Sequence, residues 1–135
     1  MSYDKPLPVP DPETKPFWDG TREGKLMVQY CASTGAHHFP PTTFCPNAGL
    51  ERPEWVQASG RGKVFSWIVV RHPVPKDVYA DAVPYAVGLI ELEEGCRMTG
   101  NIVGIDVDAI TADMPVKVVF HAVTDEITLP AFEPA

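Results

Sequence analysis

Length, composition and charge restrict the classes of protein to which this chain can belong. Its 135 residues suffice for one compact domain, and 44% hydrophobic with 21% charged residues is the balance of a globular chain. A formal net charge of −7 repels a phosphate backbone, so we expect no nucleic-acid partner. No run of about 18 apolar residues occurs, so we expect no membrane span.

The cysteines and the N-terminus favour a cytoplasmic protein. Three cysteines are few and odd in number, which fits a reducing compartment better than a secreted disulfide scaffold. The first residues, Met1–Pro6, lack the apolar core of a signal peptide. Fifteen prolines favour loops and short strands over a helical bundle.

The first segment, residues 1–29, is expected to form a helix followed by a short strand. Asp11 would be the N-cap and Pro12 the first helical position. The helix would end near Gly20 or Gly24, since glycine is a common helix terminator.

Two large aromatic side chains, Phe17 and Trp18, lie on this helix, which cannot bury both rings by itself. They must pack on the rest of the chain or on another protein. Together with Trp55 they are the candidate interface residues, because binding hot spots favour such side chains. The interface would be with a partner enzyme or with a second copy in a homodimer.

Residues 30–58 have the layout of a two-knuckle zinc ribbon that lacks half its metal ligands. Each knuckle of such a ribbon reads C-x-x-C followed by a glycine. Cys31 and Cys45 are present, whereas Thr34 and Ala48 occupy the second-cysteine positions, and a glycine still follows each. Tetrahedral zinc needs four N or S ligands. The sequence therefore predicts a degenerate, metal-free ribbon and no cofactor.

Metal binding by the histidines of the ribbon and a disulfide between its cysteines are two alternatives to a metal-free ribbon with free thiols. His37 and His38 are residue types that can bind zinc. Adjacent side chains in an extended strand point to opposite sides, however, so we do not expect both to reach one ion. Cys31 and Cys45 are expected as neighbouring thiols, since a reducing cytoplasm disfavours the disulfide that a ribbon could also accommodate. Cys96 is expected to be a packing residue at the start of a strand.

Residues 59–135 are expected to form a β domain. The segments are rich in β-branched and aromatic residues, and a hairpin turn over 93–95 joins the second strand to the third. A longer connection precedes the fourth strand, which favours a five-stranded Greek-key barrel of the OB-fold type. The predicted strands are 63–70, 85–92, 97–103, 115–123 and 127–129.

Motifs along nearly the whole chain resemble one known family. They are Pro16–Trp18, Gly24–Leu26, Cys31, Pro40–Pro41, Cys45–Pro46, Ser59–Val64, Pro84–Val87, Ile90–Gly95 and Met114–Phe120. In this order and spacing the chain resembles the domain of unknown function 35 family, OB-fold proteins with an N-terminal rubredoxin-like zinc ribbon. It departs from the family pattern at Thr34 and Ala48, and at Asp113, where many members carry glycine.

The resemblance implies a function as well as a fold. It implies a non-catalytic accessory subunit of a thiolase-like or MaoC-type hydratase enzyme in lipid metabolism, which helps to bind or channel a CoA thioester. CoA carries phosphates, so such a channel should have cations at its mouth. The candidates are Lys25, Arg61, Lys63 and Arg71.

Two other functions are the alternatives to an accessory subunit. An independent OB module could bind a small ligand or single-stranded nucleic acid by stacking bases on Phe65 and Trp67, although the acidic charge opposes nucleic acid. A thiol enzyme would need a cysteine, a base and an orienting group, and the sequence offers no such set. We therefore expect no catalytic residue.

Overall fold

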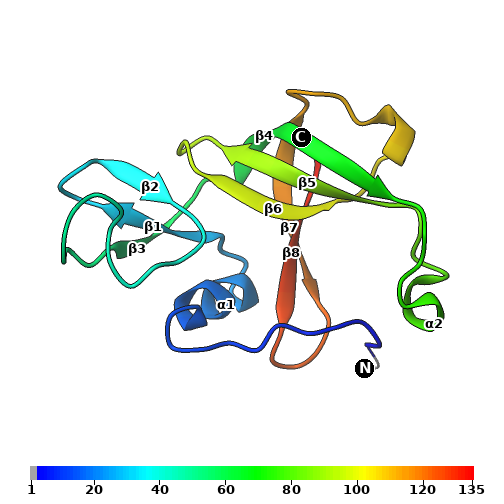
Figure 1. Cartoon of the computed structure of the whole chain (residues 1–135), viewed down its shortest axis with the longest axis horizontal. Helices are drawn as coiled ribbons and strands as arrows, with labels where there is room; N and C mark the ends of the chain where they lie inside the picture. Colours follow the sequence, from blue (N-terminus) through cyan, green and yellow to red (C-terminus); the bar gives the residue numbers. More distant parts are fainter. Residues whose placement is uncertain (1–2) are drawn as a thin grey trace.

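The computed structural model describes residues 3–135 and contains a small sheet and a closed barrel, with a helix between them (Figure 1). The small sheet has the order β2-β1-β3 and all its pairs are antiparallel. Its strands are β1 (Met27–Cys31), β2 (Ala36–His38) and β3 (Glu54–Gln57). The sheet is the ribbon predicted from the knuckle motifs, and it begins within the last residues of the expected helical segment.

Helix α1 (Lys15–Arg22) begins later than predicted. Its N-cap is Thr14, because Asp11 is used in a preceding turn instead. The Asp11 N–H donates to Thr14 Oγ1 (3.0 Å), and the Thr14 N–H donates to Asp11 Oδ1 (2.8 Å). The expected N-cap at Asp11 was therefore wrong.

Five strands form the barrel in the closed order β4-β5-β6-β8-β7. This arrangement confirms the predicted five-stranded barrel and the mainly β fold class. β8 joins β6 through one parallel pairing, Ile102 with Phe132, and pairs antiparallel with β7 along its length. The strands are β4 (Arg61–Val70), β5 (Tyr85–Leu92), β6 (Arg97–Ile102), β7 (Pro115–Ala122) and β8 (Thr128–Pro134).

The connections contain short helices, and the last strand is longer than predicted. Helix α2 (Lys76–Tyr79) lies in the proline-rich connection after β4, and the 3₁₀ turn η1 (Val107–Ala109) lies between β6 and β7. β8 runs on to Pro134 although Pro130 lies within it. Proline is tolerated there because the strand is paired along its length on one side only.

A β-bulge in β4 changes which of its side chains face outward. The register between β4 and β5 shifts between Val64 and Ser66, so strict alternation fails at Phe65. Phe65 is 46% exposed, whereas Trp67 lies opposite Gly88 and packs against the core. The alternative OB module would need Phe65 and Trp67 on one exposed face, and the two rings do not share such a face.

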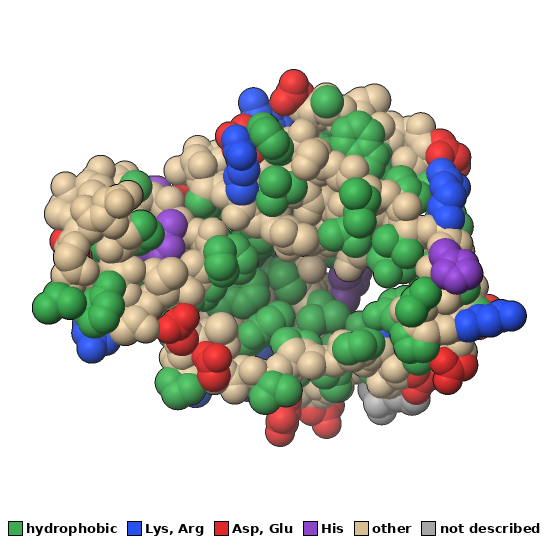
Figure 2. Space-filling view, viewed as in Figure 1, with side chains coloured by type: hydrophobic (Ala, Val, Ile, Leu, Met, Phe, Trp, Pro, Cys, Tyr) green, Lys and Arg blue, Asp and Glu red, His purple; other side chains and the backbone are tan. Residues whose placement is uncertain are grey.

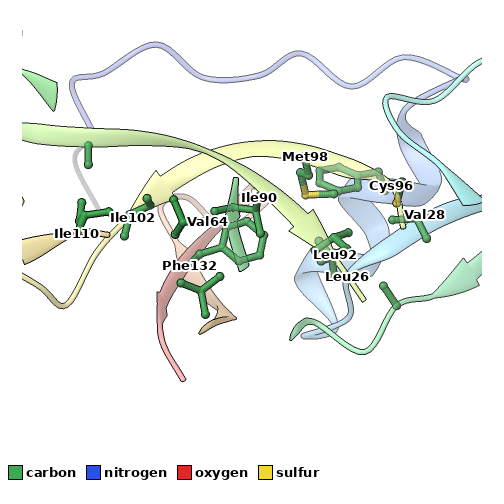
Figure 3. Packing of buried hydrophobic residues seen from close by; sticks show 14 residues of the cluster. Leu26, Val28, Val64, Ile90, Leu92, Cys96, Met98, Ile102, Ile110 and Phe132 are labelled. Carbon is green, nitrogen blue, oxygen red and sulfur yellow. The ribbon is translucent and has the colours of Figure 1, made fainter. Parts of the chain in front are cut away.

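One hydrophobic core runs from the barrel into the ribbon (Figure 3). Figure 3 shows Leu26 and Val28 of the ribbon side next to Leu92, Cys96 and Met98 of the barrel. At the junction the Ala58 N–H donates to the Leu26 carbonyl (2.8 Å). Cys96 is buried just before β6, as expected of a packing residue.

Candidate functional site

The two knuckle cysteines, Cys31 and Cys45, are joined in a disulfide. Their Cα atoms are 5.9 Å apart, which is within the usual range for such a bond, and 14 positions separate them in sequence. Both residues are buried, with 2% and 3% exposure. The expectation of two free thiols was wrong, because the ribbon fold brings the cysteines to bonding distance.

The positions of the two missing ligands are occupied by side chains that cannot replace them. Thr34 Oγ1 donates to the Cys31 carbonyl (3.5 Å) and accepts from the Ala36 N–H (3.3 Å), so it serves the turn. The methyl side chain of Ala48 has no atom that could bind a metal. The glycines that follow have positive φ, 71° at Gly35 and 61° at Gly49, so the knuckle turns persist without the ligands.

The two histidines of the ribbon point to different surroundings. His37 packs beside Tyr30, with ring centroids 4.9 Å apart. His38 Nδ1 lies 3.7 Å from Cys31 Sγ, and burial lowers the pKa of this imidazole below its usual 6.5. A carboxylate oxygen of Glu51 lies within 4.8 Å of both sulfurs.

Polar contacts hold the long ribbon loop, residues 39–53, onto the sheet and the helix segment. The buried Gln29 side chain donates to the Thr42 carbonyl (3.1 Å) and accepts from the Thr42 N–H (2.8 Å). Thr43 Oγ1 donates to Glu13 (2.8 Å). A pocket of about 350 Å³ lies between this loop and the start of the helix segment, and Trp55 lines it.

The four candidate CoA-binding cations do not form one site. β4 is ten residues long, so Arg61 at its start and Arg71 just past its end are separated by about 30 Å along the strand. Arg71 pairs with Asp108 (2.7 Å), and Lys25 pairs with Glu23 (3.2 Å). The Lys63 ammonium lies 3.6 Å from a carboxylate oxygen of Glu91 and 3.7 Å from one of Asp113. Three of the four cations therefore have carboxylate partners.

Lys63 lines a pocket of about 510 Å³ whose other charged residues are acidic. Glu91, Glu93 and Asp113 surround it there, so the pocket does not favour a phosphate. Arg61 differs from the other candidates, because its guanidinium makes no ion pair with any side chain among residues 3–135. It lies at the junction between the ribbon and the barrel.

The three aromatic candidates lie in different environments. Phe17 is only 6% exposed and packs edge-on against Trp18, with a centroid distance of 4.9 Å. Its ring is therefore used inside the chain. Trp18 and Trp55 are half-buried and rest against the core from outside. Any contribution of the three to an interface would come mainly from Trp18 and Trp55.

One face of the molecule has a hollow surrounded by hydrophobic side chains (Figure 2). It lies between the barrel and the N-terminal segment that leads to α1, as comparison with Figure 1 shows. A separate exposed apolar region on β4 includes Phe65 and Ile68, which is 62% exposed. The Arg97 guanidinium lies 3.7 Å from the Phe65 ring centroid.

Glu94 is a polar contact that the sequence did not predict. Acidic residues of a hairpin turn are usually solvated, but Glu94 Oε2 accepts from the Ser59 N–H (2.9 Å), and its other oxygen is buried without a hydrogen-bond partner among residues 3–135. The bond joins the turn to the junction before β4. Adjacent glutamates are a usual turn composition, so nothing in the pattern marked Glu94 as different.

No helix among residues 3–135 has both the length and the hydrophobicity needed to cross a bilayer.

Family models match both parts of the chain. The rubredoxin-like zinc ribbon domain of ChsH2 matches residues 18–52, and the C-terminal OB-fold domain of ChsH2 matches residues 55–121. These matches fit the two architectures described above.

Two relatives of this chain are named as enzyme subunits and are longer than it is. The chain is 36% identical over 97% of its length to a "Probable enoyl-CoA hydratase alpha subunit" of Thermomonospora curvata. It is 36% identical over 90% of its length to the "3-oxo-4,17-pregnadiene-20-carboxyl-CoA hydratase alpha subunit" of Mycobacterium tuberculosis. The chain spans only 40% and 38% of these two proteins.

A third relative and two solved structures match this chain over most of their own length as well. A "DUF35 domain-containing scaffold protein" of Methanocaldococcus jannaschii is 37% identical, and the match covers 81% of this chain and 77% of that protein. A chain of the "Ltp2-ChsH2(DUF35) aldolase" superposes with a TM-score of 0.84 at 35% identity, over 95% of this chain and 98% of that one. A DUF35 protein of Sulfolobus solfataricus shares the fold, with a TM-score of 0.65 at 14% identity, over 92% of this chain and 86% of that one. This chain therefore belongs to the DUF35 family, OB-fold proteins with an N-terminal zinc-ribbon-like segment.

Proposed function

We propose that this chain is a non-catalytic accessory subunit of a thiolase-like or MaoC-type hydratase enzyme and helps to bind or channel a CoA thioester. The observation that carries the proposal is its similarity, over nearly its whole length, to parts of two proteins named as CoA hydratase alpha subunits and to a chain of an aldolase complex. A fold that occurs with two different reactions fits a role in assembly or substrate handling better than a role in the chemistry itself.

The junction between ribbon and barrel is where we place the phosphates of CoA. Arg61 has no carboxylate partner among residues 3–135, and Lys25, which pairs with Glu23, lies on the neighbouring segment, one residue before the Leu26–Ala58 hydrogen bond. Arginine forms bidentate bonds with phosphate that a paired lysine cannot match. Lys25, Lys63 and Arg71 are the weaker candidates, because each already pairs with a carboxylate.

Two further features support the proposal. The hollow in Figure 2 is surrounded by hydrophobic side chains, which suits an acyl or pantetheine chain better than it suits a charged ligand. The half-buried Trp18 and Trp55 offer large side chains for a partner enzyme, or for a second copy of this chain.

The proposal is tested first by assembly. The tagged chain is recovered from its native host, bound proteins are identified by mass spectrometry, and the complex is sized by light scattering. We expect a thiolase-like or hydratase-type protein in near-equal amount, and weaker recovery with the Trp18→Ala and Trp55→Ala variants. A chain that is recovered alone or only as a homodimer contradicts the accessory-subunit role.

CoA binding is tested separately by calorimetry on the complex. Arg61→Ala should weaken binding of a CoA ester roughly 10-fold or more, since a charged hydrogen bond to phosphate is lost. Arg71→Ala, the same charge change at the far end of β4, is the matched control and should have little effect. Equal effects of both variants would indicate a general electrostatic contribution and contradict a site at the junction. Tight binding of a single-stranded oligonucleotide at physiological salt would instead favour the independent OB module.

A further inference from the structure

The zinc ion that the ribbon family implies does not fit the residues of this ribbon. The sulfurs of Cys31 and Cys45 are bonded to each other, so neither is a thiolate that could bind a metal. The hydroxyl of Thr34 serves the knuckle turn, and Ala48 supplies no ligand atom. The four N or S atoms of a structural zinc site are therefore not available.

We propose that the Cys31–Cys45 disulfide replaces zinc as the cross-link of this ribbon, and that thiol–disulfide exchange at this bond sets how firmly the loop 39–53 is held. The two cysteines come one from each knuckle, and tying the knuckles together is what the metal does in a structural ribbon. Burial of both residues places the bond where the metal would otherwise be enclosed. The ribbon then depends on the thiol redox state rather than on metal supply.

The surroundings of the bond also accommodate the reduced state. The Thr42 hydroxyl donates to the Phe44 carbonyl (2.7 Å), so its oxygen accepts from His38 Nε2–H (2.9 Å). This arrangement leaves His38 Nδ1 as an acceptor, 3.7 Å from Cys31 Sγ. A Cys31 thiol formed by reduction could donate to this nitrogen, so the reduced form of Cys31 has an acceptor at hand.

The exchange needs a second thiol pair and no metal. A dithiol of the thioredoxin class gives up two electrons and two protons, its own disulfide forms, and the Cys31–Cys45 bond becomes two thiols. Re-oxidation is the reverse reaction with a protein or low-molecular-weight disulfide. No other bond of the chain changes.

Reduction should loosen the loop without unfolding the sheet. The loop keeps the two hydrogen bonds between Gln29 and Thr42, and the bond from Ser33 Oγ to Glu51 (2.8 Å). The disulfide itself constrains the unfolded chain, and closing a loop of this length contributes appreciably to stability. We expect reduction to lower the melting temperature, and to speed amide exchange in the loop but not in the barrel.

The first test counts thiols and zinc in the full-length protein. Purified in air and denatured without reductant, the chain should show one reactive thiol, Cys96, rising to three after reduction. Zinc measured by plasma mass spectrometry should stay far below one atom per chain, before and after the reduced protein is incubated with zinc sulfate. Three thiols without reductant, or about one zinc per chain in either state, would overturn the proposal.

The second test uses matched variants. A dithiol reductant should lower the Tm of the wild type by roughly 10 °C, as expected for a loop of this length. The reductant should lower the Tm of Cys96→Ala by the same amount, because this variant keeps the disulfide. It should not change the Tm of the Cys31→Ala/Cys45→Ala double variant. A wild type whose Tm and loop exchange rates are insensitive to reductant would show that the bond does not hold the ribbon.

A bound metal would leave a distinct signature in the same samples. Cobalt added to the reduced protein would give the visible bands of a tetrahedral site if Cys31, Cys45, His38 and Glu51 acted as ligands. That result would overturn the replacement of the metal by the disulfide, whereas a colourless sample would support it.

Discussion

The ribbon and the barrel of this chain are stabilised by different means. The barrel has fully buried aliphatic and aromatic side chains, among them Val64, Ile90 and Phe132. The ribbon beyond the shared core depends on a disulfide and on a few hydrogen bonds, those of Gln29 above all. Stability in the barrel is thus spread over many contacts, whereas in the ribbon it depends on a few bonds that can be removed one at a time.

The largest expected effect is in the barrel. Phe132→Ala should lower the free energy of unfolding by about 3–5 kcal/mol, because a fully buried ring leaves a cavity. Chemical denaturation measures the change. The control, Ile68→Ala on the exposed face of β4, should change the free energy by less than about 0.5 kcal/mol. Similar values for the two variants would remove the contrast between core and surface.

A smaller and more local effect is expected in the ribbon. Gln29→Met keeps the side-chain volume but removes both hydrogen bonds to Thr42, at a cost of about 2 kcal/mol. Hydrogen exchange should quicken at the Thr42 amide and remain unchanged in β5 and β6. The exposed Gln57 on β3 supplies the control Gln57→Met, which should leave exchange in the loop unaltered. Faster exchange throughout the barrel would show that the two regions do not differ as described.

The turn before β7 should respond to the shape of one residue. Asp113 has a φ of 63°, and its N–H donates to the Val64 carbonyl (2.8 Å). Asp113→Val should cost about 1–2 kcal/mol, because a β-branched residue is strained in this conformation. Asp113→Gly should leave the Tm nearly unchanged, since glycine adopts the same φ freely. Equal losses for both variants would point to the carboxylate instead of the backbone.

The smallest effect is expected at Cys96. Burial first, and the charge of Glu94 to a lesser extent, raise the pKa of this thiol above its usual 9.0. The folded chain therefore holds the proton more tightly than the unfolded chain, and the thiol's contribution to stability is lost as the pH rises above 9.0. Alkylation of the native protein with iodoacetamide, followed by mass spectrometry, should show a midpoint above that value. A midpoint at or below 9.0 would contradict the burial argument.

The sequence predicted the barrel well and its details less well. β5 was predicted residue for residue, because a short apolar run that ends at a turn with glycine marks a hairpin strand. β8 was predicted too short, since Pro130 interrupts a pattern that its one-sided pairing tolerates. The bulge at Phe65 could not be read from β4 itself, because it depends on the register with β5.

At the candidate site the sequence identified residue types but not their partners. The knuckle positions of Cys31 and Cys45 were correct, yet the argument from compartment predicted free thiols, and only the folded distance shows that the two can bond. The candidate cations were chosen by residue type alone. The carboxylate partners of Lys63 lie on β5 and in the turn before β7, and they come next to it only in the folded chain. The expected zinc-free state and the CoA contacts stay predictions.

The unbroken core between barrel and ribbon has a mechanical consequence. Leu26 and Val28 on one side pack with Leu92 and Met98 on the other, so the two parts cannot rotate independently without exposing apolar surface to water. A protein that binds the ribbon thereby also fixes the orientation of the barrel. An enzyme that contacts only one end of this chain would still have the other end presented to it at a constant angle.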